Sequence, residues 1–366
     1  MRRPNLPNPA NLATNVLEYR ATARRGTVAG RRHCSDNPAG AMVEVSVGAE
    51  SAGSMDESAA DWQSLQDALA ALVRGDLSQL DSCLVMHGPK SVINGTRANF
   101  RCHFIRSDAN DAPRIKALAE QLALEVLFHC IPRSDVVHMR ALADGNDQLR
   151  ESTRLAKKAA ALFTTKQPSS GEGGELLLYA LLEQGLGVPQ ILSKMSLKTN
   201  PEVQVHGTDG VHAKILDSGN LALYWGEAKI WDSLSSAIAD CFDSITPYLL
   251  GEAVEQDTWL IKHYADLGDD ELKSRVLEYF DNSNPKSANV EVRGACLIGF
   301  TQADYPVLPK SATELQEQLD ASICKWQSSV SRKILNSKIE SYELEIFFLP
   351  VPSADDFRKA IMGAIR

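Results

Sequence analysis

The sequence predicts an α/β (α+β) protein in which helices flank a β-sheet, and three segments carry this prediction. Residues 173–185 have the length and apolar content of a helix, with glycines at its start and end. Residues 211–216 and 220–231 are rich in apolar and aromatic side chains and read as strands. The turn-forming residues 217–219 separate them, so we expect an antiparallel hairpin.

Further elements are expected on both sides of this central segment. Upstream of it we expect a helix near 59–74, a strand at 99–106, and helices near 112–129 and 146–164. Downstream of it we expect helices near 231–249, 269–281 and 311–335, strands at 290–300 and 343–351, and a terminal helix that Ser353 and Asp356 cap. The order of helix, hairpin, helix and strand favours one mixed sheet covered by helices.

The chain is expected to contain three regions. Residues 1–55 form a leader rich in Arg, Asn, Pro, Ala and Gly, which predicts disorder. It lacks the apolar core of a secretory signal but has some transit-peptide character, and Met42 or Met55 is an equally acceptable start. Residues 56–165 are predicted to be a smaller N-terminal α/β region that contacts a partner, and residues 166–366 a second domain.

Composition limits the function classes. No apolar run approaches the roughly 20 residues that cross a bilayer, so a membrane role is not expected. The seven cysteines are scattered without a C-x-x-C pair, which indicates reduced thiols in a cytoplasmic protein. The formal net charge is -9. Bulk electrostatic attraction therefore does not explain nucleic-acid binding by this chain, and a metal ion or a partner would have to assist it.

Three carboxylates and a lysine are predicted to meet at one end of the hairpin. Glu227 and Lys229 share one face of their strand, while Ala228 points to the other. Asp209 precedes the first strand and comes opposite the region of Glu227. Glu175 lies on the apolar stripe of the preceding helix, where an unpaired carboxylate is costly. That cost favours a functional role for Glu175.

The chemistry of this set suits a divalent cation. Mg²⁺ prefers hard oxygen ligands and takes only a few protein carboxylates together with phosphate oxygens. Glu175, Asp209 and Glu227 are the candidate metal ligands, and Lys229 is placed to orient water or screen charge. Each residue alone also has an ordinary explanation, as a helix-terminal charge, a turn residue or a cross-strand pair. The hydrolysis of a nucleic-acid backbone depends on all four acting together.

The order Glu175, Asp209, Glu227-x-Lys229 resembles the PD-(D/E)xK motif of the restriction-endonuclease-like superfamily, with Thr208 in place of the proline. The sequence around these residues resembles the C-terminal domain shared by the HamA nuclease subunit of Hachiman anti-phage defence and anti-bacteriophage protein A. Four stretches carry that resemblance, which extends from about residue 60 to the C-terminus: residues 171–179, 194–200, 205–212 and 225–229.

The resemblance implies a restriction-endonuclease-like core with a mixed sheet and an Mg²⁺-dependent DNA nuclease, with Mn²⁺ as an alternative metal. It also implies action on DNA together with a superfamily 2 helicase subunit, HamB-like in type. The alternative is a catalytically inactive nuclease-fold subunit that binds or guides DNA for the helicase.

Other residues near the motif have weaker signals. Lys194 and Lys198 are one helical turn apart and either face DNA phosphate or form a solvated basic face. His206 and His212 flank Asp209, which suggests a zinc site, but strand alternation places both histidines opposite Asp209. We expect them to position neighbours or contact substrate. The glycines at 171–174 lack a following Gly-Lys-Ser/Thr, so a nucleotide-binding P-loop is not expected.

Overall fold

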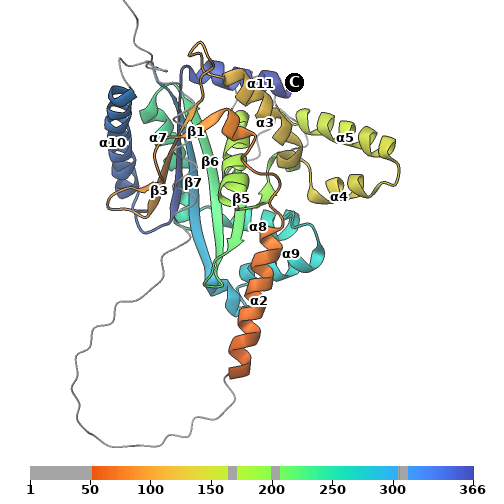
Figure 1. The fold of residues 1–366 in the computed structure, drawn as a ribbon. Coiled ribbons are helices and arrows are strands. Elements are labelled where there is room, and N and C mark those ends of the chain that lie inside the picture. Colours follow the sequence, from red (N-terminus) through yellow and green to blue (C-terminus); the bar gives the residue numbers. More distant parts are fainter. Residues whose placement is uncertain (1–51, 164–170, 199–206, 304, 306–311) are drawn as a thin grey trace, which may run out of the picture. The chain divides into compact units, whose positions relative to one another are not determined.

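The computed structural model describes residues 52–163, 171–198, 207–303, 305 and 312–366 (Figure 1). The sequence prediction for the leader before residue 52, and the position of His206, lie outside these residues. Residues from Ala52 to Arg366 belong to one compact unit. None of the described helices has both the length and the apolar composition needed to cross a bilayer.

One mixed sheet forms the centre of this unit, as predicted. Its strands run in the order β1 (Leu84–Met86), β3 (Ala98–Ile105), β8 (Leu344–Val351), β7 (Val290–Thr301), β6 (Leu221–Trp231), β5 (Gly210–Ile215) and β4 (Gln190–Ser193), and β2 (Ser91–Val92) also pairs with β3. The four strands β3, β8, β7 and β6 are parallel to their neighbours in this group, whereas β1, β2, β4 and β5 pair antiparallel. The long apolar runs in β7 and β8 match this central position, because parallel strands are covered on both faces.

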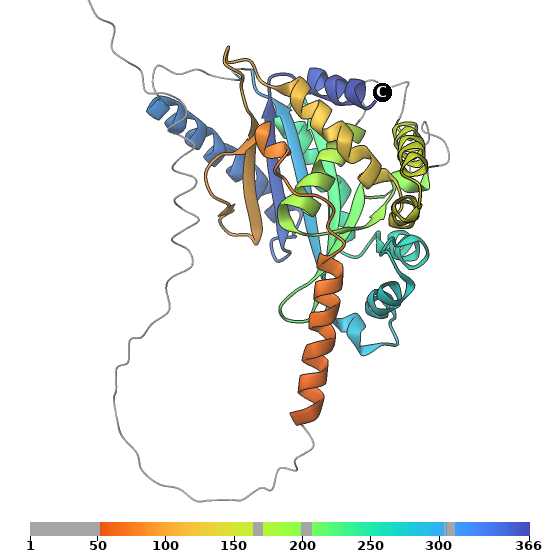
Figure 2. The same ribbon diagram turned by 45° about the vertical axis from the view of Figure 1, so that its right-hand side comes forward.

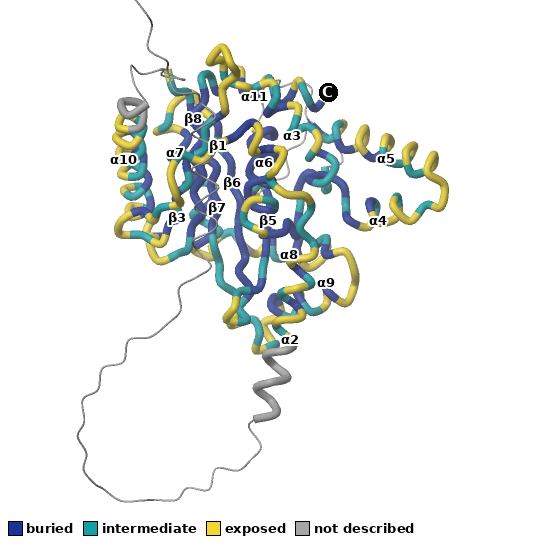
Figure 3. The backbone as a smooth tube through the Cα atoms, in the orientation of Figure 1, coloured by how far each residue is buried: buried dark blue, intermediate teal, exposed yellow. Residues whose placement is uncertain are grey.

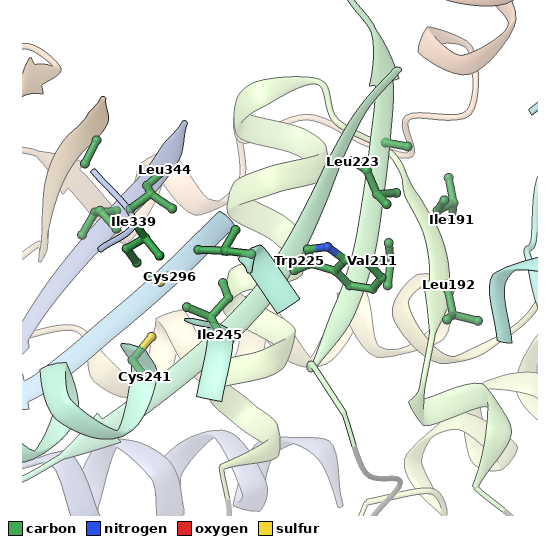
Figure 4. Close-up of a cluster of buried hydrophobic side chains, with 14 of the residues drawn as sticks. Ile191, Leu192, Val211, Leu223, Trp225, Cys241, Ile245, Cys296, Ile339 and Leu344 are labelled. Atoms are coloured by element: carbon green, nitrogen blue, oxygen red, sulfur yellow. The ribbon is translucent and has the colours of Figure 1, made fainter. Parts of the chain in front are cut away.

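Helices cover the sheet on both faces (Figures 1 and 2). One apolar cluster joins the sheet to α2 (Ala52–Ala70), α7 (Leu234–Leu249), α8 (Val254–Tyr264), α9 (Asp270–Leu277) and α10 (Ala312–Asn336). Figure 4 shows part of it, with Trp225 beside Val211 and Leu223. The second cluster joins the sheet to α3 (Ile115–Cys130), α5 (Gly145–Ala160), α6 (Glu172–Ala180) and α11 (Ala354–Ile365). The central strands are the most deeply buried part of the trace (Figure 3).

Strand β6 shows how alternation builds these two cores. Leu223 and Trp225 point into the first cluster, whereas Ala228 and Ile230 point into the second. Glu227 and Lys229 have the same parity as Trp225 and therefore project on the α7 side. The predicted separation of Ala228 from Glu227 and Lys229 is thus observed.

The antiparallel hairpin of β5 and β6 and all the predicted helices and strands are present, with ends shifted by a few residues. The short elements β1, β2, β4, α4 (Arg133–Ala141) and α8 were not predicted. A π-helical turn, η2 (Leu181–Gly185), continues α6 where the prediction had a single helix. Short 3-10 turns complete the described chain: η1 (Leu80–Ser82), η3 (Met195–Leu197), η4 (Glu278–Phe280) and η5 (Pro285–Asn289).

The division into residues 56–165 and 166–366 needs correction. Strand β3 from the first region pairs in parallel with β8 near the C-terminus, with Ala98 opposite Leu344. Helices α3 and α5 pack in the same cluster as α6 and α11. A shared sheet and core cannot be separated without exposing apolar surface, so these regions form one folding unit.

Candidate active site

The candidate site lies where β6 extends beyond its partner β5. The pairing of the two strands ends at Gly210 opposite Gly226, and the Asp209 amide donates one further hydrogen bond to the Gly226 carbonyl at 2.9 Å. Strand β6 then continues to Trp231 with β7 on its other side. Residues 227–231 therefore have one edge that β5 does not cover.

Asp209 occupies the start of this edge. Its Oδ2 atom accepts a hydrogen bond from the backbone amide of Ala228 at 2.7 Å. The bond takes the place of the next hydrogen bond that β5 would have made. It also holds the carboxylate beside the peptide that joins Glu227 to Lys229.

Glu227 and Lys229 form an ion pair on the α7 side of the sheet. The Lys229 Nζ atom lies 2.5 Å from Glu227 Oε1, and Glu227 is only 3% exposed. Helix α7 covers the pair: the Cys241 thiol lies 3.5 Å from the Glu227 carbonyl, and Ser244 donates a hydrogen bond to the Glu227 carboxylate. The predicted same-face relationship of Glu227 and Lys229 is therefore realised in a buried environment.

Glu175 reaches the site from the opposite face. Helix α6 begins against β6 at Gly174, where an added Cβ would lie 3.1 Å from Ile230 Cδ1 and 3.4 Å from Ala228 Cβ. Glycine therefore permits the close approach of helix and strand at this point. Glu175 follows in the first turn of α6. Because the edge of β6 is open here, carboxylates from both faces of the sheet come near one another.

The charges show that the four residues interact. Burial, followed by the charge of Glu172, raises the pKa of Glu175 from 4.5 to about 7, and Glu227 adds to this shift. Burial raises the pKa of Asp209 well above its ordinary value, and both Glu227 and Glu175 reinforce the shift. Burial raises the pKa of Glu227 as well, although Lys229 opposes it. Three carboxylates thus share a site that disfavours their ionisation.

Lys229 responds in the opposite direction. Burial alone would lower the pKa of Lys229, but the charges of Glu227 and Asp209 raise it above its ordinary value. The amine therefore remains protonated and supplies one positive charge to the three acids. In this state Lys229 is suited to screening negative charge, and it would lose its proton and become able to act as a base only after the acids had been neutralised.

The two predicted phosphate-binding lysines are paired with carboxylates. Lys198 forms an ion pair with Glu172 in the first turn of α6, and Lys194 lies 2.8 Å from Asp257 of α8. Both lysine side chains are less than a tenth exposed. Neither forms the solvated basic face that the sequence allowed. Instead, each lysine anchors the β4–η3 segment beside the candidate site.

His212, which we expected to position neighbours or contact substrate, is buried. It is 2% exposed, and its Nδ1 donates a hydrogen bond to the Val188 carbonyl at 2.9 Å. Its ring lies near Tyr179 of α6. Burial lowers the pKa of His212 to about 4, so it is neutral. This histidine therefore positions β5 against its neighbours, the first of the two roles predicted for it.

Several residues around the site were not predicted. The charge of Glu172 raises the pKa of Glu175, and Glu172 forms an ion pair with Lys198. Its position within residues 171–179, which carry the family resemblance, was the available signal in the sequence. Asp257 accepts hydrogen bonds from Lys194 and from the Thr208 hydroxyl, at 2.8 and 3.3 Å. No sequence pattern connects Asp257 with Thr208, because helix α8 comes to lie next to the hairpin only when the chain folds.

The donor set fits a divalent cation in chemical type. Glu175, Asp209 and Glu227 supply hard oxygen atoms. Burial raises the pKa of all three, Glu227 adds to the shift of the other two, and Glu175 adds to that of Asp209, so a cation would relieve the repulsion. Within the described part of the chain, no three or more His, Cys, Asp or Glu side chains are gathered so that they could hold a metal ion. Glu227 instead pairs with Lys229, and Asp209 accepts a hydrogen bond from the Ala228 amide.

A comparison of the sequence with models of protein families gives a match. The model of the HamA family matches residues 83–365, which run from the start of β1 to the end of α11. The chain belongs to the HamA family. A comparison with curated proteins finds no match.

Membership of the HamA family indicates a protein of anti-phage defence. The family match includes β1–β3 and α3–α5 as well as the hairpin. This agrees with the single sheet and core described above. In this HamA-family chain, the open edge of β6 is the place where acidic and basic groups converge within the matched region.

Proposed function

We propose that this protein is a metal-dependent DNA nuclease of the PD-(D/E)xK type that acts in anti-phage defence. The observation that carries the proposal is the convergence of Glu175, Asp209, Glu227 and Lys229 at the open edge of β6. A structural ion pair needs only Glu227 and Lys229. The two additional carboxylates raise the electrostatic cost of the site, and function gives a reason for that cost.

The three acidic residues and the lysine would have different roles. Glu175, Asp209 and Glu227 would hold Mg²⁺ or Mn²⁺, which, when bound, supplies Lewis acidity toward a phosphate oxygen and lowers the pKa of water. Lys229 would place its ammonium beside the phosphate and stabilise negative charge that develops during hydrolysis. The Ala228 amide keeps Asp209 in position through its hydrogen bond. Helix α7 keeps Glu227 away from solvent.

The overall charge supports a partner that brings DNA to the site. The chain carries a formal charge of -9, and the two lysines of the β4–η3 segment are already paired. An acidic protein gains little from non-specific attraction to phosphate. A superfamily 2 helicase subunit, of the HamB type that the family resemblance implies, would supply that DNA.

Cleavage assays test this function. The purified chain and its partner helicase are incubated with plasmid and linear DNA in the presence of Mg²⁺. Glu227→Gln and Lys229→Ala should each lower the cleavage rate by about a hundredfold or more, because a preorganised charged group is lost. Glu120→Ala is the matched control, since Glu120 is an exposed acid paired only with Lys116 on α3.

Two outcomes would contradict the proposal. Cleavage that survives in both site variants would show that the reaction occurs elsewhere. If the wild-type complex cuts no DNA with Mg²⁺ or Mn²⁺ but still binds DNA, the chain is an inactive guide subunit.

A further inference from the structure

A second polar site lies beside the β4–η3 segment. A small pocket, partly open to solvent, lies between the end of α3, the start of α4 and strand β4. The polar residues that line it include Arg74, His129, Arg133, Gln190, Ser193 and Asp266. None of them belongs to the carboxylate site described above. Ser193 directly precedes Lys194; burial lowers the pKa of Lys194, and the charges of Asp209 and Glu227 from the carboxylate site oppose this shift by a smaller amount.

Carboxylates hold the two arginines of the pocket in place. Arg74 Nε lies 3.0 Å from Glu183 Oε1, and Glu183 is fully buried in the π-helical turn. Arg133 Nη1 lies 3.3 Å from the Asp266 carboxylate and donates to the Gln190 backbone carbonyl at 2.9 Å. The guanidinium groups are therefore preorganised. Two arginines and two carboxylates also leave the cluster without excess charge.

Four buried polar atoms of the lining residues have no hydrogen-bond partner among the described residues. They are Arg74 Nη1, Arg133 Nε, His129 Nε2 and Ser193 Oγ. His129 and Arg133 are more than nine-tenths buried. Buried polar groups almost always have a partner, because an unsatisfied donor costs about 1–3 kcal/mol. Their grouping around one pocket indicates a missing ligand.

The missing ligand must accept hydrogen bonds. Both arginine atoms are donors. The Gln190 amide nitrogen donates to His129 Nδ1 at 3.5 Å, so neutral His129 carries its hydrogen on Nε2, which is also a donor. The Ser193 hydroxyl supplies a fourth hydrogen. One water molecule accepts only two hydrogen bonds, whereas a tetrahedral oxyanion offers enough lone pairs for all four.

We propose that this pocket binds a phosphate group, either inorganic phosphate or the terminal phosphate of a nucleotide or oligonucleotide. The arginine N–H groups, the His129 Nε2–H and the Ser193 hydroxyl would donate to its oxygens. Because the charges of the cluster balance, hydrogen bonds provide the affinity. Binding should therefore depend only weakly on ionic strength, unlike binding to exposed lysines.

Calorimetric titration of the full-length protein tests the site. EDTA is included so that no divalent cation bridges phosphate to Glu175, Asp209 or Glu227. The ligands are orthophosphate, a deoxynucleoside monophosphate, and one oligonucleotide with either a 5′-phosphate or a 5′-hydroxyl. A preference for the 5′-phosphorylated oligonucleotide over the 5′-hydroxyl form identifies a DNA end as the source. Equal binding of orthophosphate and the nucleotide identifies the free anion.

Ser193→Ala removes one donor and should weaken binding roughly tenfold or more. Ser196→Ala is the matched control, because Ser196 also lines the pocket but already donates to the Ser193 carbonyl at 2.7 Å. Arg133→Lys should weaken binding further, and Ser193→Ala still decides the question if that variant fails to fold. The absence of saturable binding in wild type, or equal affinity of wild type and Ser193→Ala, would overturn the proposal and leave water in the pocket.

Discussion

The Asp209 carboxylate accepts a hydrogen bond from the Ala228 amide at 2.7 Å, across nineteen residues of sequence. This bond ends the β5–β6 ladder and fixes the carboxylate at the open edge of β6. The main chain therefore holds Asp209 in place while its charge is disfavoured by Glu227 and Glu175. Four predictions follow from this and from related contacts.

The pKa of Glu175 predicts a pH-dependent stability. Its pKa rises from 4.5 to about 7 on folding, so the folded protein binds this proton more tightly than the unfolded chain. The stability that protonation provides is present below pH 4.5 and is lost as the pH rises through about 7. In EDTA, Glu175→Gln should be more stable than wild type at pH 8 by up to about 3 kcal/mol, and nearly equal at pH 5. Urea unfolding at both pH values measures the difference, and a gap independent of pH would contradict the assignment.

Added metal should stabilise the folded protein. If Glu175, Asp209 and Glu227 hold Mg²⁺, a concentration one hundred times the dissociation constant adds about 3 kcal/mol to the free energy of unfolding. Asp209→Asn keeps an oxygen for the Ala228 amide but removes one charge, so its Mg²⁺-dependent gain should be much smaller. Thermal unfolding with Mg²⁺ and with NaCl of equal ionic strength makes the comparison. A gain of the same size in both proteins would place the metal elsewhere.

The buried ion network at Glu183 should be important for stability. Glu183 is 0% exposed, and its Oε1 lies 3.0 Å from Arg74 Nε. Its Oε2 accepts a hydrogen bond from the backbone amide of Gln190 at 2.8 Å. Burial raises the pKa of Glu183, but Arg74 and Arg133 lower it overall. Glu183→Ala should destabilise the protein by about 3–5 kcal/mol, because a buried arginine loses its counter-charge.

Removal of an exposed acid is the control for the loss of stability in Glu183→Ala. Glu120→Ala on the surface of α3 should cost less than about 1 kcal/mol, because its ion pair with Lys116 is solvated. Urea denaturation of both variants gives the two free energies. Similar small losses would show that the network contributes little.

The contact between α6 and α11 depends on Gly173. A Cβ there would lie 2.9 Å from Ile361 Cγ2. Gly173→Ala should therefore lose about 1–3 kcal/mol through overpacking, despite the higher helix propensity of alanine. Gly363→Ala in α11 meets nothing within 4 Å and should gain about 0.5–1 kcal/mol. Thermal unfolding distinguishes them, and stabilisation of both variants would show that α6 can move away from Ile361.

The hairpin and its acidic end were predictable because both depend on local pattern. Alternation placed Glu227 and Lys229 on one face, and the short turn placed Asp209 beside Gly226. The long helices and central strands followed from their apolar periodicity. The short strands β1, β2 and β4 have too few residues to produce a clear period, so they were missed.

The sequence pattern did not predict which strands and side chains pair over long distances in the chain. The residues of β3 carry no signal that they pair with β8, and the predicted boundary near residue 165 failed for that reason. Lys194 and Lys198 were predicted either to face DNA phosphate or to form a solvated basic face, but the fold supplies Asp257 and Glu172 as their partners. A side chain's partner depends on which distant segments pack together.

The long helices, the central strands and the four groups of the candidate site of this HamA-family chain could be read from its sequence, since apolar patterns and local spacing encode them. The fold was needed to show that β6 extends beyond β5, so that Glu175 from one face of the sheet comes near Glu227 and Lys229 on the other. It also decided that these acids share a desolvated edge that raises their pKa values. Burial and electrostatic coupling arise from packing between segments far apart in the chain, and no local pattern records them.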